Sequence, residues 1–396
     1  MRSVELFSGA GGLALGFGLA GFDHEAVVEW DRWACDTIRQ NQLENYSLVK
    51  DWNVIEGDVR EIDWSSIKGP IDLVSGGPPC QPFSLGGKHG ADEDRRDMFP
   101  AATDVIRQLA PSAFVLENVK GLTRARFANY FQYVQLSLSL PEITQRKNET
   151  WHEHFVRIQR EHTSGKHSTL TYRVVANVIN AADYGVPQQR HRVFVIGFRS
   201  DVEAEWSFPE PTHSREALRV AQEDGSYWSR HHIPKSRRPD LMGSPRPLDA
   251  DVQLLPWRTV RDALIGLPSP TLRPRREVLN HVLQPGARSY VGHTGSPLDL
   301  PAKTLKAGDH GVPGGENMLR NGDGSVRYFT VREAARLQTF PDSYELHGTW
   351  TEAMRQLGNA VPVLLAQQVA GSVYEHLEFA KLRAKRGRRK TRGAVA

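Results

Sequence analysis

Short apolar runs alternate with segments of helical periodicity over residues 2–120, which is typical of a doubly wound α/β domain with a parallel sheet. Strand-like apolar runs occupy residues 3–7, 24–30, 72–77 and 113–119, and another closes the region at 192–198. Helical periodicity occurs between them, near 11–20, 31–42 and 99–109. In such folds, ligands bind at the carboxyl ends of the strands.

The regular pattern is lost over residues 199–327, which are rich in Pro, Arg, His and Gly. This change predicts a second, smaller, loop-rich domain that contains some β-structure. Helical periodicity returns at 329–341, where Thr330 and Glu333 have the spacing of a capping box, and a last helix is predicted near 361–378. The expected domains are 1–198, the second domain at 199–345, a return to the first domain at 346–380, and a tail at 381–396.

The composition describes a globular protein without a membrane segment. Hydrophobic residues make up 39% of the 396 residues, the mean hydropathy is −0.48, and no apolar run approaches the roughly 20 residues that span a bilayer. The first residues lack the features of a secretory signal, and there are only two cysteines, Cys35 and Cys80. We therefore expect a cytoplasmic protein with free thiols.

Positive charge is concentrated at the end of the chain. Residues 381–396 contain eight Lys or Arg and no acid, so with +4 for the whole chain the preceding residues carry −4. Low apolar content predicts that this tail is disordered. It either contacts phosphates non-specifically or is merely solvated.

A polar segment at 143–170 contains four histidines: His152, His154, His162 and His167. Neither thiolates nor a regular ligand spacing accompany them, so a solvated insertion is favoured over a metal site.

The first chemical motif is a strand followed by a glycine-rich turn and a helix, at residues 4–17. Glycines at 9, 11 and 12 would let a ligand approach the backbone, and Glu29 at the end of the next strand could bind a ribose hydroxyl. By itself this pattern serves NAD, FAD or S-adenosylmethionine equally, and a plain structural turn also fits it.

The second motif, GGPPCQPFS at 76–84, follows a strand at its carboxyl end. Cys80 lies on a stiff turn between prolines, which suits a nucleophile. Cys35 lies within a helical pattern and is expected to be buried filler.

Two further motifs place polar groups at strand ends. Glu117 and Asn118 end an apolar strand, where a carboxyl group can have a raised pKa and donate a proton, or simply cap the surface. Gln188, Arg190 and Arg192 alternate along an incoming strand and could hold a phosphate or a base carbonyl.

Together these motifs resemble those of the C5-cytosine DNA methyltransferase family, in the family's own order. The similarity covers about 1–125, 172–198 and 328–378. The matching blocks are LFSGAGG at 6–12, Pro79-Cys80-Gln81, Glu117-Asn118-Val119, the Gln188–Arg192 block, TVREAARLQTFPD at 330–342 and RQLGNAVPV at 355–363.

The resemblance implies a Rossmann-like methyltransferase fold and covalent catalysis. The Cys80 thiolate would add to C6 of a flipped cytosine while Glu117 protonates or hydrogen-bonds N3, after which C5 takes the methyl group. Arg192 would bind the cytosine O2 and orient Glu117, and Arg190 would contact the neighbouring backbone.

The cofactor implied by the resemblance is S-adenosylmethionine, and no metal is needed. Phe7 and Trp30 would flank the adenine, Glu29 would bind the ribose, and Asp58 the adenine amino group. The other residues expected in the pocket are Ser8, Gly9, Gly11, Gly12, Pro78, Met98 and Asn359.

The resemblance also implies double-stranded DNA as substrate, read at a short site by the second domain. Residues 84–96 would close over the flipped base, and 300–315 form either a DNA-facing loop or a structural Gly-Pro turn. A role in bacterial restriction–modification, beside a cognate endonuclease acting on the same site without direct contact, follows as an expectation. So do a monomeric state and association with the nucleoid.

Three rival functions share some of these features. A tRNA cytosine methyltransferase of the same fold would carry a Cys-Phe-Thr signature, which is absent. A zinc-dependent base deaminase would need a second cysteine where Phe83 stands. A catalytically dead DNA-binding module has no need for Cys80, Glu117, Arg190 and Arg192 together.

Overall fold

The computed structural model of the chain describes residues 1–79, 97–165, 169–238, 254–274, 277–307 and 315–393, with side chains up to residue 385. Cys80 and the loop predicted at 84–96 lie outside these described residues, as do residues 308–314 of the loop at 300–315.

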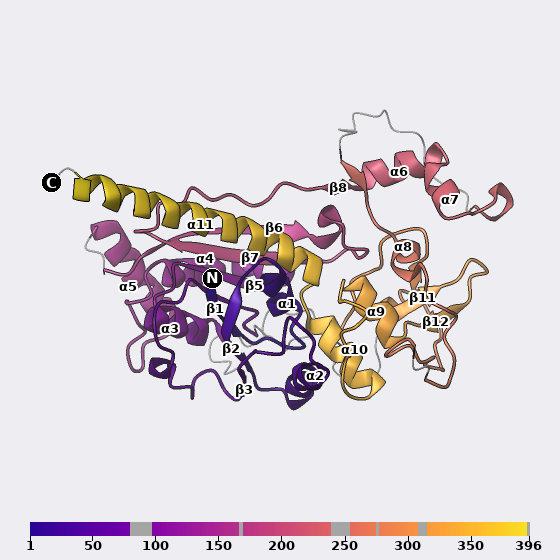
Figure 1. Cartoon of the computed structure of the whole chain (residues 1–396), viewed down its shortest axis with the longest axis horizontal. Helices are drawn as coiled ribbons and strands as arrows, with labels where there is room; N and C mark the ends of the chain where they lie inside the picture. Colours follow the sequence, from indigo (N-terminus) through magenta and orange to yellow (C-terminus); the bar gives the residue numbers. More distant parts are fainter. Residues whose placement is uncertain (80–96, 166–168, 239–253, 275–276, 308–314, 394–396) are drawn as a thin grey trace.

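A seven-stranded, mostly parallel sheet forms the centre of the first domain (Figure 1). Its strands are β1 (Arg2–Leu6), β2 (Asp23–Glu29), β3 (Val54–Glu56), β4 (Leu73–Gly76), β5 (Ala113–Val119), β6 (Tyr172–Asn180) and β7 (His191–Arg199). They lie in the order β3-β2-β1-β4-β5-β7-β6, and β7 alone runs antiparallel to both its neighbours. The chain order changes direction between β1 and β4, which is where open α/β sheets form a ligand crevice.

Helices cover both faces of this sheet, so the predicted doubly wound α/β fold is confirmed. One face packs against α3 (Phe99–Leu109), α4 (Ala128–Ser139) and α5 (Trp151–Ser164). The other packs against α1 (Gly12–Leu19) and α11 (Val363–Gly393), the first and last helices of the chain. Between β2 and β3, α2 (Arg32–Leu43) adds Ile38 to a neighbouring hydrophobic cluster.

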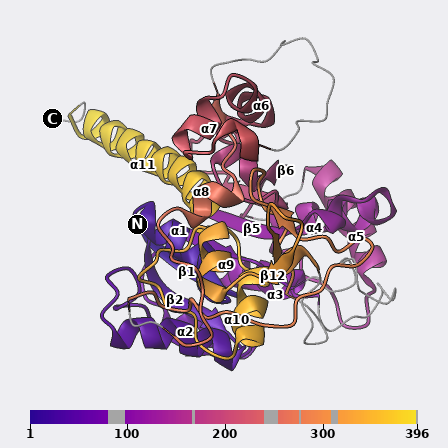
Figure 2. The ribbon, with the colours of Figure 1, turned by 90° about the vertical axis from the view of Figure 1, so that its right-hand side faces the viewer.

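The described part of the second domain is loop-rich and contains some β-structure, as expected, arranged in two small sheets (Figures 1 and 2). Its strands are β8 (His213–Ser214), β9 (Leu255–Pro256), β10 (Ser296–Pro297), β11 (Met318–Arg320) and β12 (Val326–Tyr328). Its helices are α6 (Arg215–Glu223), α7 (Ser226–Arg230) and α8 (Val260–Leu264). A small core of its own contains Leu218, Tyr227, Trp228 and Trp257.

The chain then returns to the first domain through α9 (Val331–Leu337) and α10 (Trp350–Asn359). The predicted capping box is confirmed, because the Thr330 hydroxyl accepts the Glu333 N–H while the Glu333 carboxylate accepts the Thr330 N–H. Phe329 and Leu305 share a hydrophobic cluster with Ala10 and Ile38. The late part of the second domain therefore packs directly on the cofactor-loop side of the first.

Four features differ from the expectations. The strands β3 and β6 were not predicted. Gln188 and Arg190 precede β7 instead of lying on it. The segment at 143–170 is not a solvated insertion: it contains α5, which buries Phe155 and Ile158, and its buried His154 bonds to the Tyr133 hydroxyl and the Ile143 carbonyl. Finally, α11 continues to Gly393, where disorder was expected from residue 381.

Within the described part of the chain, no helix is both long and apolar enough to cross a membrane. The same residues contain no group of three or more His, Cys, Asp or Glu side chains that could hold a metal ion.

Candidate functional site

The candidate site lies at the carboxyl edge of the sheet, where four parallel strands end. The cofactor loop follows β1, Glu29 ends β2, the Pro-Cys turn follows β4, and Glu117 lies near the end of β5. Because β7 is antiparallel, its first residues return to this same edge, and Arg192 pairs in register with Val119. The topology thus gathers predicted residues that are up to about 190 positions apart in the sequence.

Glu29 fixes the cofactor loop through its carboxylate. It accepts the Gly9 N–H at 2.7 Å, the Trp30 N–H at 2.9 Å and the Asp31 N–H at 2.8 Å. Burial raises the pKa of Glu29, while these three bonds oppose the shift. A carboxylate accepts roughly four hydrogen bonds, so about one site is left for a ligand hydroxyl.

The glycines of the loop have different roles. Gly9 has φ +54°, and a Cβ built there meets nothing within 4 Å, so its backbone borders open space. A Cβ at Gly12 would come within 2.4 Å of the Val361 carbonyl oxygen, which makes Gly12 a packing residue between α1 and the C-terminal return. Gly11 is intermediate, with φ +86° and the Tyr344 hydroxyl 3.3 Å from such a Cβ.

Four other predicted cofactor residues differ in their surroundings. Phe7 adopts φ +54°, an uncommon conformation for a non-glycine residue. Ser8 anchors the loop by donating its N–H to the Val28 carbonyl. The Trp30 ring is 74% exposed, which leaves it free to stack on a ligand, whereas Asp58 is engaged in bonds with Arg60.

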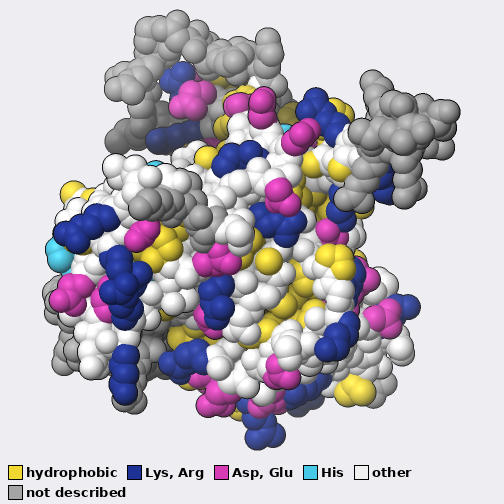
Figure 3. Space-filling view, turned by 90° about the vertical axis from the view of Figure 1, so that its left-hand side faces the viewer, with side chains coloured by type: hydrophobic (Ala, Val, Ile, Leu, Met, Phe, Trp, Pro, Cys, Tyr) yellow, Lys and Arg dark blue, Asp and Glu magenta, His cyan; other side chains and the backbone are white. Residues whose placement is uncertain are grey.

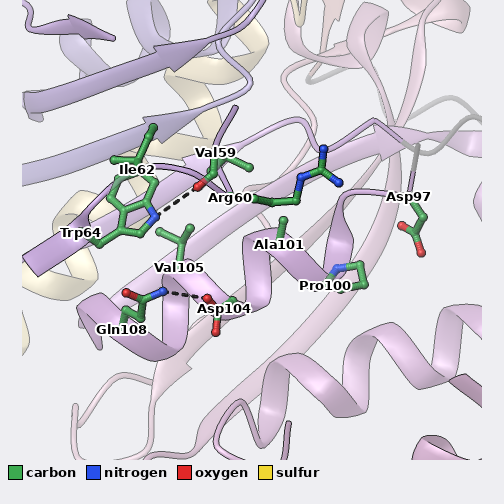
Figure 4. A pocket seen from close by; sticks show the side chains of 10 residues that line it. All are labelled: Val59, Arg60, Ile62, Trp64, Asp97, Pro100, Ala101, Asp104, Val105 and Gln108. Carbon is green, nitrogen blue, oxygen red and sulfur yellow. Dashed lines mark hydrogen bonds between the residues drawn. The ribbon is translucent and has the colours of Figure 1, made fainter. Parts of the chain in front are cut away.

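A cavity of about 270 Å³ lies between α3 and the 3-10 turn η1 (Trp64–Ser66) (Figure 4). None of the predicted cofactor residues lines it, although Asp58 and Met98 are each adjacent in the sequence to a residue that does. The cavity was not foreseen from the sequence. It is lined by Val59, Arg60, Ile62, Trp64, Asp97, Pro100, Ala101, Asp104, Val105 and Gln108.

Glu117 and Arg192 form a buried ion pair. The Arg192 Nε lies 2.7 Å from the Glu117 Oε1, and the two side chains are 10% and 8% exposed. Burial raises the pKa of Glu117 above its ordinary value, although the charges of Arg192 and Arg190 oppose the rise. Glu117 is thus a buried carboxyl group whose raised pKa favours the protonated form.

Arg190 is fully buried and holds two other segments in place. Its guanidinium donates to the Leu305 carbonyl at 3.0 Å and to the Gly358 carbonyl at 2.6 Å. Gln188 supports the same arrangement by accepting the Leu305 N–H at 3.0 Å. Arg190 therefore ties the second domain and the end of α10, where Asn359 lies exposed, to the carboxyl edge.

The turn that precedes Cys80 is held from both sides. Asn118 donates its side-chain N–H to the Pro78 carbonyl at 2.9 Å, and the Met98 N–H donates to the Pro79 carbonyl at 3.1 Å. A Cβ at Gly77 would lie 3.3 Å from the Glu117 Oε2, so the turn begins beside that carboxylate. The side chain of Cys80 itself lies outside the described residues.

Two positioning residues were not among the predicted site residues. Asn118 is the first, and its signal was a polar residue at the end of an apolar strand. Gln338, at the C-terminal end of α9, is the second: its buried amide donates to the Leu357 and Ala360 carbonyls on either side of Asn359. Its place in a helical apolar pattern gave no sign of that contact.

A family model described as C-5 cytosine-specific DNA methylase matches residues 1–139, 159–243 and 274–375. The type II methyltransferase M.XorII of Xanthomonas oryzae pv. oryzae is 31% identical, over 94% of this chain and 84% of its own. M.NgoMIV of Neisseria gonorrhoeae is 29% identical over 95% of this chain and 98% of its own.

Solved structures share the fold at lower identity. A DNA modification methyltransferase encoded within an E. coli prophage superposes with a TM-score of 0.57 at 23% identity, covering 96% of this chain and 99% of its own. The DNMT2 protein of Spodoptera frugiperda gives 0.55 at 17% identity, over 94% and 99%.

Proposed function

The chain belongs to the C-5 cytosine-specific DNA methylase family, and from this premise we propose that it methylates a flipped-out cytosine through a covalent adduct between Cys80 and C6. At the family level it is a DNA cytosine-5 methyltransferase that uses S-adenosylmethionine. The observation that carries the finer proposal is the buried Glu117–Arg192 pair beside the turn that leads into Cys80.

The residues of the cofactor loop fit S-adenosylmethionine. Gly9 presents backbone beside open space, Glu29 retains about one acceptor site for a ribose hydroxyl, and the exposed Trp30 ring can stack on adenine. When bound, the cofactor supplies an electrophilic methyl group. We assign its binding to these residues together with Phe7, Ser8, Gly11, Asp58, Pro78, Met98 and Asn359, whereas Gly12 acts through packing.

Cytosine C5 is a poor nucleophile, so the ring must be activated. The Cys80 thiolate adds to C6, and Glu117 delivers a proton or hydrogen bond to N3, which moves electron density to C5. C5 then takes the methyl group, which leaves S-adenosylhomocysteine. A base removes the C5 proton, the Cys80 thiolate is expelled as the C5–C6 double bond forms again, and Glu117 takes back the N3 proton. The raised pKa of Glu117 supports its part as the proton donor.

The two arginines have separate tasks in this mechanism. Arg192 holds the Glu117 carboxyl and faces the cytosine O2 with its remaining donors, and its charge favours the Cys80 thiolate. Arg190 acts as a positioning residue, because its guanidinium is engaged by the carbonyls of Leu305 and Gly358.

The target carbon is inaccessible within a duplex, so the cytosine must leave the stack, which costs a few kcal/mol. We assign the reading of a short DNA site to residues 199–345. The relatives named type II methyltransferases support a protective role in restriction–modification, with an endonuclease that acts on the same site.

The experiment that tests this function is methyl transfer from labelled S-adenosylmethionine to unmodified plasmid DNA and unmodified tRNA, with bisulfite sequencing of the DNA. Methylcytosine at one short repeated motif is the expected result. Label in tRNA alone would move the mechanism to RNA, and label in neither would indicate an inactive binding module.

A further inference from the structure

The basic C-terminal segment lies at the opposite edge of the sheet from the candidate site. α11 begins at Val363, close to Asn359 and to the Gly358 carbonyl that Arg190 binds at the carboxyl edge. Lys381 forms an ion pair at 2.6 Å with Asp72, which directly precedes β4 and so marks the amino edge. At about 1.5 Å per residue, these points of the helix are about 27 Å apart.

Beyond this ion pair, the helix leaves the body of the protein. Among the side chains that the structure describes, Ala380 is the last buried one, and residues 381–385 are all exposed. The backbone remains helical to Gly393, about 18 Å further along the axis. Figures 1 and 2 show α11 projecting from the sheet, away from the second domain.

Positive charge is concentrated in this projection and not on the body around it. Residues 381–392 hold all eight cations of the segment, whereas the rest of the chain is net negative at −4. The face of the body on the side where α11 ends mixes Lys and Arg with Asp and Glu (Figure 3). A helix with eight cations and no acid is complementary to the phosphates of a duplex.

The distance between the basic segment and the candidate site determines whether both can contact the same duplex. The Debye length is about 8 Å at physiological ionic strength, so charges about 27 Å from the candidate site are screened from DNA held there. A duplex in that site could reach the amino edge only by bending sharply around the domain, against a persistence length of about 150 base pairs.

We propose that residues 381–393 bind a second segment of duplex DNA, distinct from the duplex that is methylated. This inference rests on DNA being the substrate. The extension holds the enzyme near DNA during transfer between segments, so it accelerates the search for sites on long DNA and contributes nothing to the reaction on a short one.

The test compares three proteins: the full chain, a variant lacking 382–396 that keeps the Lys381–Asp72 pair, and a tail variant with Arg388→Gln, Arg389→Gln and Lys390→Gln. Glutamine preserves helix propensity. The matched control neutralises three cations at the same edge of the body, Lys50→Gln, Lys68→Gln and Arg107→Gln.

Two measurements are made on each protein. The first is kcat/KM on a short duplex that holds one site, and on the same site in a plasmid. We expect kcat/KM of the tail variants to match that of the full chain within about twofold on the short duplex and to fall by about fivefold or more on the plasmid. The salt slope of non-specific binding should be reduced by about 3 in the triple variant. The second is the number of short duplexes bound per chain at low salt, expected to fall from two to one.

Equal losses on both substrates would overturn the proposal by placing the tail on the methylated duplex. If kcat/KM is unchanged on both substrates, the tail is merely solvated and the proposal is overturned. A loss on the plasmid of the same size in the control variant would also overturn it. Absence of methylation by the full chain would instead contradict the proposed function, while the stoichiometry of duplex binding would still test the second site.

Discussion

The Arg192 Nε contacts the Glu117 Oε1 at 2.7 Å, and both side chains are almost fully removed from solvent. A buried pair of this kind stabilises little by itself, because desolvation offsets much of the attraction. Its value lies in orientation: the guanidinium fixes the carboxyl group while burial raises the pKa of that group.

Replacing Glu117 with Gln removes the proton and keeps the size of the side chain. We expect kcat to fall by about 10²- to 10⁴-fold, the usual contribution of general acid catalysis, with duplex affinity changed by less than about threefold. Single-turnover methylation and fluorescence anisotropy measure the two quantities. Equal losses in both would assign Glu117 a structural role.

The pH profile reports on the same pair. Because Glu117 must carry a proton to act on N3, kcat should decline as pH rises through its pKa, which burial raises. Arg192→Met removes a charge that favours the carboxylate, so in the residual activity this alkaline limb should move to higher pH. A limb that stays in place would mean that another group controls it.

The two cysteines provide an internal control. Cys80→Ala should abolish methyl transfer while leaving S-adenosylmethionine binding intact. Burial raises the pKa of Cys35 to about 12, so this thiol is inert near neutral pH. Iodoacetamide at pH 8 should therefore inactivate the Cys35→Ala enzyme as fast as the wild type. If Cys35→Ala protected the enzyme from inactivation, the reactive thiol would be Cys35 and not Cys80.

Alanine substitutions at two glycines of the cofactor loop should differ in the property they affect more, which is cofactor binding at Gly9 and stability at Gly12. Gly9→Ala meets no neighbour but strains a φ of +54°, so we expect a loss of about 1 kcal/mol in stability and a weakening of cofactor binding of tenfold or more. Gly12→Ala collides with the Val361 carbonyl and should cost about 2–3 kcal/mol. Calorimetry of binding and urea unfolding distinguish them, and a stability loss at Gly9 as large as at Gly12 would contradict the assignment.

Glu5, on β1, gives stability a dependence on pH. It is fully buried, bonds to the Ser75 hydroxyl, and burial raises its pKa from 4.5 to about 8. Between these values the unfolded chain releases the proton that the folded chain keeps, so stability falls as pH rises through this window. Glu5→Gln should be more stable than the wild type by a few kcal/mol at pH 8 but not at pH 4. Equal unfolding midpoints of Glu5→Gln and the wild type at pH 8 would show that Glu5 does not cause the pH dependence.

The strands with strong apolar runs were predicted well from the sequence. The observed limits of β1, β2, β4, β5 and β7 each lie within a residue or two of the predicted ones. β3 is only three residues long and β6 is an edge strand with exposed positions, so neither has a clear apolar run. Their existence depends on pairing with neighbours, which a local pattern does not contain.

Candidate residues were found where a polar group interrupts an apolar strand end. The partners of Arg190 could not be found in this way, because they are backbone carbonyls at Leu305 and Gly358, more than 100 positions away. Similarly, the histidines of 143–170 suggested a polar segment, yet burial of His154 depends on Tyr133 of another helix.

The contact of α1 with α11 joins the beginning of the chain to its end. A Cβ at Gly16 would lie within 2.4 Å of the Ala366 Cβ, so the two helices fit only at close range. About 340 residues separate them, which the ribosome adds in tens of seconds at roughly 5–20 residues per second. During that time α1 can pack on the sheet through Leu13 and Phe17, but its contact with α11 is missing, as is the packing of Gly12 against Val361. We therefore expect cofactor binding to begin only after the start of α11 has been synthesised, so a chain terminated before Val361 should not methylate DNA.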